Sequence, residues 1–176
     1  TNWQRNVLIS LKGVLFIACA CLFAGYGILS AKAGGTNEVT VPAGSNAKTI
    51  QMYLDWNTSG YYDELIINIP DGKYALDRTL YVYSNTTINA GEKAVFEKQK
   101  INGAMLEGKI VNDKGGYDTV TNITIDGGVW DSTPVIGSKV EGTETFRFIH
   151  ASNIQIMNAE FSNVPVGSHL IVFAGV

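Results

Sequence analysis

The run NITID at residues 122–126 decides the fold, because a close copy of it, NIQIM, follows at residues 153–157. A weaker copy, NTTIN, precedes both of them at residues 85–89. The similarity extends beyond the runs themselves, since Trp130 and Phe161 each lie eight residues after the asparagine that begins their copy. The sequence therefore repeats a short structural unit.

Each copy alternates apolar and polar residues, as a half-buried β-strand does. Ile123 and Ile125 fall on one face of such a strand, and the asparagine and threonine fall on the other. If each copy is one turn of a solenoid, equivalent residues stack roughly 4.8 Å apart, with isoleucines inside and asparagines at the corner. The copies are 37 and 31 residues apart, and such unequal spacing is expected when a loop of each turn varies in length.

Short strands and one helix are expected in the region before the repeats. The strands are predicted at 65–69, 74–76 and 80–83, where turn residues separate them. The helix is predicted from Ala47 to about Asn57, with Ser45 as its N-cap. Ala47, Ile50 and Leu54 would form its apolar stripe, which should cover one end of the strands.

An antiparallel sandwich is the main alternative, because it also produces short alternating strands. Two-residue hairpin turns between well-matched strands are scarce in the sequence, however, and an aligned repeat has no reason to exist in a sandwich. The pattern favours an all-β solenoid over the sandwich.

Residues 1–33 have the pattern of a secretory signal peptide. Arg5 and Lys12 precede an apolar run at 13–29, and AKA at 31–33 resembles a cleavage site. A membrane anchor is the alternative, but the 17 apolar residues make a helix of only about 25 Å, shorter than the ~30 Å hydrocarbon core. We therefore expect a secreted or cell-surface protein that meets the membrane only through this segment, and we expect a linker at 34–45.

The cysteines belong to the same N-terminal segment. Cys19 and Cys21 both lie within the apolar run, so the mature chain would use neither disulfides nor thiolate metal sites. Lipidation at Cys19 is a further alternative, since FIA at 16–18 loosely resembles a lipidation box.

The charge of the mature chain argues against nucleic acid as a partner. Removing Arg5, Lys12 and Lys32 from 13 basic residues leaves 10 against 16 acidic residues, a net charge of −6. Nucleic-acid affinity needs clustered cations instead. The nearest cluster is interleaved with glutamates and is expected on a solvated loop face; it consists of Lys93, Lys98, Lys100 and Lys109.

Several motifs together resemble the pectate-lyase-like superfamily of right-handed parallel β-helices. They are the N-terminal helix, INIPDGKY at 67–74, SNTTI at 84–88, NITIDGGVWD at 122–131 and NIQI at 153–156. The resemblance is to the N-terminal part of polygalacturonase-like hydrolases and tail-spike-like proteins, and it covers residues 46–176. It implies a right-handed parallel β-helix over residues 46–176 with an N-terminal capping α-helix and three short sheets around a narrow apolar core. It also implies polysaccharide bound along an outer groove and no organic cofactor, with calcium possible in a lyase.

The resemblance also implies inverting hydrolysis by carboxyl groups about 6.5–9.5 Å apart. The family's catalytic motifs, Asn-x-Asp, an Asp pair, Gly-His-Gly and Arg-x-Lys, do not occur in the sequence, and GSH at 167–169 comes nearest. We therefore expect a fragment truncated at its C-terminus, from a glycoside hydrolase whose catalytic residues follow Val176. A noncatalytic adhesin or tail-spike-like binding module, or a polysaccharide lyase, is the alternative.

Weak candidates for catalysis are Asp126, Asp131 and His169. The two aspartates could act as acid and base or bind calcium, although aspartate before Gly-Gly or in a loop is also ordinary turn chemistry. His169 could shuttle a proton or bind a sugar hydroxyl, with Arg147 and Glu144 on a neighbouring turn as substrate-binding candidates. No metal site is expected.

Exposed aromatic side chains could stack on sugar rings, and Tyr117 is the candidate for this role. Trp130 shares its register with Phe161, so an aromatic stack in the core explains both residues better than a sugar platform does.

Overall fold

The structure, a computed structural model, describes residues 34–99, 103–111, 115–133, 144–165 and 167–175. The predicted signal peptide at 1–33 lies outside these residues. Across the described ranges, no helix is both long enough and apolar enough to span a bilayer.

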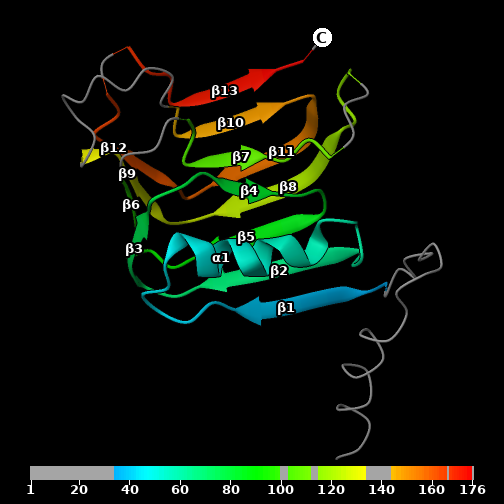
Figure 1. Ribbon diagram of the computed structural model, residues 1–176, viewed down its shortest axis with the longest axis horizontal. Coiled ribbons are helices and arrows are strands. Elements are labelled where there is room, and N and C mark those ends of the chain that lie inside the picture. The colour runs from blue at the N-terminus through cyan, green and yellow to red at the C-terminus, as the bar shows by residue number, and fades with distance from the viewer. Residues whose placement is uncertain (1–33, 100–102, 112–114, 134–143, 166, 176) are drawn as a thin grey trace, which may run out of the picture. The chain divides into compact units, whose positions relative to one another are not determined.

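The described strands form three sheets, in which all neighbouring strands are parallel (Figure 1). Sheet A contains β1 (Thr36–Thr40), β2 (Glu64–Ile69), β5 (Thr86–Ala90), β8 (Val120–Asp126) and β11 (Ala151–Met157). Sheet B contains β3 (Gly72–Leu76), β6 (Ala94–Lys98), β9 (Val129–Asp131) and β12 (Glu160–Ser162). Sheet C contains β4 (Leu80–Val82), β7 (Leu106–Gly108), β10 (Phe146–Ile149) and β13 (Ile171–Ala174).

From β2 onward the chain visits sheets A, B and C in turn, as β2–β4, β5–β7, β8–β10 and β11–β13. This order is compatible with a parallel β-helix. The antiparallel alternative is wrong for the described residues, because every strand pair in them is parallel.

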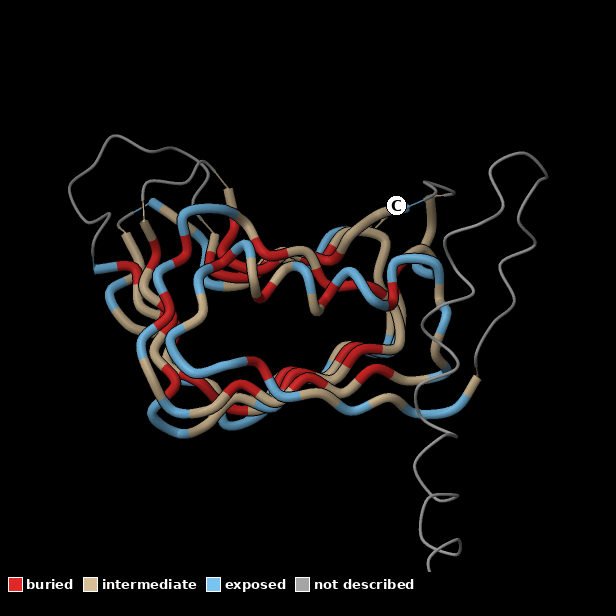
Figure 2. The backbone as a smooth tube through the Cα atoms, turned by 60° about the horizontal axis from the view of Figure 1, so that its bottom comes forward, coloured by how far each residue is buried: buried red, intermediate tan, exposed pale blue. Residues whose placement is uncertain are grey.

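The register of sheet A confirms the alignment of the repeats. Ile154 pairs with Ile123 and Ile156 with Ile125, and Ile125 in turn pairs with Ile88 of the weaker copy. Equivalent isoleucines therefore lie side by side on neighbouring strands, as the spacing of the copies predicts. Figure 2 shows the buried residues along the inner side of the successive turns.

Aromatic side chains continue this stacking in sheet B. The ring of Trp130 stacks on Phe96 with centroids 4.1 Å apart, and Phe96 stacks on Tyr74 at 5.4 Å. Trp130 is fully buried and pairs in register with Phe161. The prediction that Trp130 belongs to the core is confirmed.

Helix α1 (Ala47–Leu54) continues into a 3₁₀ turn, η1 (Asp55–Asn57). Its N-cap is Asn46, whose Oδ1 accepts from the amide of Thr49 at 2.9 Å, so the prediction of Ser45 as the cap is wrong. The hydroxyl of Ser45 instead donates to the carbonyl of Pro42. An asparagine directly before the first helical residue is placed to satisfy a free amide, and the residue before it is one position too early.

The helix closes the first edge of sheet C with side-chain amides. Gln51 of α1 accepts from the amide of Tyr81 at 2.7 Å and donates to the carbonyl of Tyr81 at 3.0 Å. Asn57 similarly donates to the carbonyls of Ser84 and Asn85. The two bonds of Gln51 replace those of a neighbouring strand, so the backbone groups of Tyr81 at the edge of β4 are paired. The apolar stripe predicted for the helix, Ala47, Ile50 and Leu54, is buried as expected.

Residues 34–45, expected as a linker, include β1, which pairs in parallel with β2. Lys98 also differs from expectation, because it is fully buried and not on a solvated loop face. It follows Ala94 and Phe96 on the inward face of β6. Its ammonium group donates to the carbonyls of Gly103 at 2.8 Å and Glu144 at 3.4 Å, and burial lowers the pKa of Lys98 to about 8.

Candidate functional site

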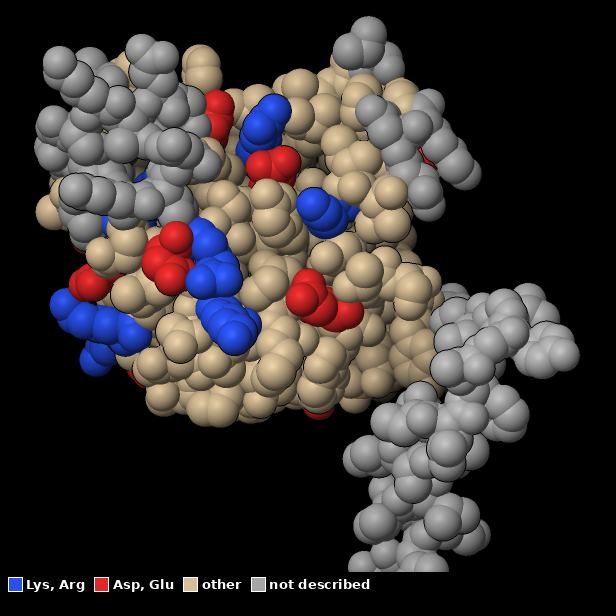
Figure 3. Space-filling view, viewed as in Figure 1, with Lys and Arg blue, Asp and Glu red and all other residues tan. Residues whose placement is uncertain are grey.

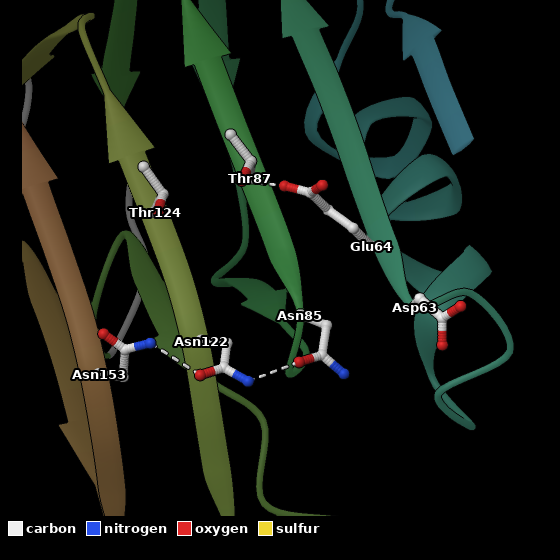
Figure 4. Close-up of a pocket in the computed structure, with 7 residues that line it drawn as sticks. All are labelled: Asp63, Glu64, Asn85, Thr87, Asn122, Thr124 and Asn153. Carbon is white, nitrogen blue, oxygen red and sulfur yellow. Dashed lines mark hydrogen bonds between the residues drawn. The ribbon is translucent and has the colours of Figure 1, made fainter. Parts of the chain in front are cut away.

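An asparagine ladder crosses sheet A, from Asn85 directly before β5 to the third residues of β8 and β11, Asn122 and Asn153 (Figure 4). The side-chain amide of Asn153 donates to Oδ1 of Asn122 at 2.8 Å, and that of Asn122 donates to Oδ1 of Asn85 at 2.8 Å. The three residues have φ values of 54°, 58° and 59°. Asparagine tolerates this left-handed conformation better than most residues, so it satisfies both the corner backbone and the ladder.

Further polar rows cross the outer face of sheet A beyond the ladder. Thr87 pairs with Thr124, which pairs with Gln155. In the next row the side chain of Asn89 donates to Asn68 at 3.1 Å, and Asn68 donates to Glu38 at 2.7 Å. The outer face thus presents amides and hydroxyls while the inner face of the same strands presents isoleucine.

A hollow of about 280 Å³ lies beside the ladder. Its lining combines the ladder and the threonine row with two carboxylates; the residues are Asp63, Glu64, Asn85, Thr87, Asn122, Thr124 and Asn153. Glu64 reaches toward Thr87, whose hydroxyl donates to it at 3.3 Å, while Asp63 directly precedes β2 and lies on the side of Asn85 away from Asn122 (Figure 4).

The carboxylates are held by the neighbouring strand and turn. Glu64 accepts from the hydroxyl of Thr36 at 3.4 Å, and Asp63 accepts from the amide of Gly35 at 2.6 Å. The hollow therefore combines fixed acceptors with amides and hydroxyls that can both donate and accept. Such a set can bind a ligand rich in hydroxyl groups.

The structure places the candidate aspartates in different sheets. Asp126 ends β8 of sheet A and accepts from the side-chain amide of Asn158 at 2.7 Å. Asp131 ends β9 of sheet B and accepts from both the amide and the hydroxyl of Thr133, at 2.9 and 2.6 Å. Between them the corner needs glycine, because a Cβ on Gly127, where φ is 86°, would lie 2.1 Å from the carbonyl oxygen of Ala90.

The surroundings of Asp131 favour its ionised form. Partial burial acts to raise the pKa of Asp131, but hydrogen bonds from Thr133, Asn163 and Ser162 outweigh it and hold that pKa below its ordinary value. A carboxylate stabilised in this way is a poor proton donor near neutral pH.

Glu144, Arg147 and His169 lie on adjoining segments of sheet C. Strand β10 pairs with β13, where Arg147 is opposite Val172, and the amide of Thr145 donates to the carbonyl of Leu170. The segment that carries Glu144 therefore runs beside the one that carries His169. The guanidinium of Arg147 faces a different partner, Glu107, at 4.0 Å.

Tyr117 is 59% exposed and lies near the other end of β10, in a shallow pocket with Phe148 and Phe173. It is therefore not among the residues that line the hollow on sheet A. Within the described part of the chain, no group of three or more His, Cys, Asp or Glu side chains gathers as metal ligands would.

Sequence reasoning did not single out Asp63 and Glu64. The sequence does carry a signal for the threonine row. Asn85 and Asn122 are each followed two positions later by a threonine, Thr87 or Thr124, which must lie on the same outer face as the asparagine. The position of the two carboxylates beside these rows depends on pairing between strands more than twenty residues apart.

The fold and this face define an all-β protein of three parallel sheets with one short helix. Comparisons with protein-family models, with curated proteins and with solved structures each returned no match to the chain.

Proposed function

We propose that this is an exported polysaccharide-acting protein of the right-handed parallel β-helix class, with its glycan lying along the outer face of sheet A. In this proposal the three parallel sheets belong to one continuous right-handed coil, as the resemblance to the pectate-lyase-like superfamily implies. One observation carries it: amide and hydroxyl side chains of neighbouring strands form continuous rows beside the hollow that Glu64 and Asp63 border.

The spacing and chemistry of the rows suit a chain of sugars. Equivalent side chains on neighbouring strands repeat about every 4.8 Å. Each sugar hydroxyl both donates and accepts a hydrogen bond, as do the amides of Asn122 and Asn153 and the hydroxyls of Thr87 and Thr124. Carboxylates lie beside the rows, Glu64 next to Thr87 and Glu38 next to Asn68, and they can accept further hydrogen bonds from sugar hydroxyls.

Hydrolysis of the polygalacturonase type is the enzymatic form of the proposal, and elimination by a lyase is its variant. Binding without cleavage is a second candidate. It is favoured by the partners of the two candidate aspartates, because Asn158 holds Asp126 and Thr133 holds Asp131 in separate sheets. Release of reducing ends from bound glycan distinguishes cleavage from binding alone.

Affinity electrophoresis of the full chain through gels that contain pectin, other plant glycans or bacterial glycans tests the binding. Thr124→Arg should remove most of the retardation, because an arginine at this outward position fills the hollow without entering the core. Ala75→Arg is the matched control, since Ala75 is exposed on β3 of sheet B. Equal retardation of both variants and the wild type, or retardation by no glycan, would overturn the proposal.

A further inference from the structure

The outward face of α1 carries large apolar side chains that are not packed into the core. Met52 is 53% exposed and Trp56, in the following η1 turn, is 41% exposed. Lys48, Met52 and Trp56 follow one another at intervals of four residues, so they line one side of the helix. The solvent-facing side of an amphipathic helix is normally polar. Exposed Met52 and Trp56 on this side therefore suggest a surface that binds a ligand.

A groove of about 700 Å³ runs along this side of the helix. Its lining consists of Asn46, Lys48, Thr49, Gln51, Met52, Asp55, Trp56 and Arg78. This volume lies within the range of small-molecule sites, about 300–1,000 Å³. The helix packs against β3 and β4, in sheets B and C, so the groove is distinct from the hollow on sheet A.

Two cations line the groove on a chain whose net charge is −3. Figure 3 shows basic side chains gathered over the first turns of α1, with acidic side chains beside them. Arg78 bonds Asp77 at 3.0 Å, but both side chains are at least half exposed, and such a pair contributes little. A ligand carboxylate can therefore compete for the guanidinium.

The one carboxylate in the lining is already engaged. Oδ1 of Asp55 accepts from the side-chain amide of Gln51 at 2.7 Å and from the hydroxyl of Tyr83 at 3.2 Å. Lys48 and Arg78 thus offer positive charge in the groove that Trp56 also lines, with Lys48 about 12 Å from Trp56 along the helix. The groove is therefore complementary to an elongated ligand that has an apolar face and an acid group.

We propose that this groove is a second glycan site that binds an oligohexuronate, with one sugar ring against Trp56 and the carboxylate of a neighbouring unit between Lys48 and Arg78. It rests on the proposed function only in taking the ligand to be a sugar. The aromatic face packs against the C–H groups of the ring, and the charge-assisted hydrogen bonds select the carboxylate.

Protection of Trp56 from acrylamide quenching tests this site in the full chain. Trp130 is fully buried, and Trp56→Phe identifies the part of the quenching that belongs to Trp56. The probes are a trimeric oligouronate and its methyl ester, which has the same rings without the charges. The oligouronate should protect Trp56, and Lys48→Gln and Arg78→Gln should each weaken its binding roughly fivefold or more.

Lys73→Gln is the matched control, because Lys73 is an exposed cation on β3 that pairs with Glu97 outside the groove. Equal protection by the methyl ester, or equal affinity of Arg78→Gln and Lys73→Gln, would overturn this site. If a glycan retards the wild type but not Thr124→Arg, and the oligouronate leaves Trp56 unprotected, the groove fails and the proposed function stands. If the oligouronate protects Trp56 while no glycan retards the protein in a way that depends on Thr124, the groove stands and the proposed function fails.

Discussion

Replacing the buried Lys98 by methionine should change how the free energy of unfolding depends on pH. Burial lowers the pKa of Lys98 from 10.5 to about 8 in the folded protein. The folded state therefore binds fewer protons at this position than the unfolded state between pH 8 and 10.5. Wild-type stability should rise with pH across this window, and the penalty of the buried charge is fully present below pH 8.

The size of the effect follows from the shift in pKa. A difference between 10.5 and about 8 corresponds to about 3 kcal/mol, which screening by nearby water reduces to roughly 1–3 kcal/mol. Methionine also removes the donor to the carbonyls of Gly103 and Glu144, at a cost of about 1 kcal/mol or more. That cost does not depend on pH, so the pH dependence is the decisive quantity.

Urea unfolding at several pH values from 7.5 to 10.5 measures this dependence. The stability of Lys98→Met relative to wild type should fall by roughly 1–3 kcal/mol over the window as the wild type loses its penalty. Lys73→Met is the control, because the hydrogen bond and charge of Glu97 raise the pKa of the exposed Lys73 instead of lowering it. Parallel curves for Lys98→Met and the wild type would refute the reasoning.

Substitutions at two further positions test the stacking of sheet A. Asn122→Ala should destabilise the protein by about 2 kcal/mol, because it removes two ladder bonds and leaves an alanine at a φ of 58°. Asn122→Gly keeps that backbone without strain and should recover about 1 kcal/mol of this loss in denaturant unfolding, so equal losses would count against the conformational part of the argument. Thr86→Val should stabilise by about 1 kcal/mol, since the buried hydroxyl of Thr86 has no hydrogen-bond partner among the described residues. An unchanged or lower melting temperature for Thr86→Val would contradict this.

The sequence alone was sufficient to predict the faces of the strands and their alignment. Ile125 and Ile156 alternate with polar residues at the strand period, and the same pattern in both copies required them to occupy equivalent places. The apolar stripe of α1 was equally readable, because the spacing of Ile50 and Leu54 reports only the local helical period. These predictions depend on neighbours within one element or on its copy.

The tertiary structure decided what lies beside each element. Glu64 meets Thr87 only because β2 pairs with β5, and no local pattern fixes that register. Lys98 is buried because it follows Phe96 on the inward face of β6, although lysine as a residue type strongly favours solvent. Side-chain identity and local period determine which face of an element is apolar, whereas long-range strand pairing determines which polar groups come together and which charge is enclosed.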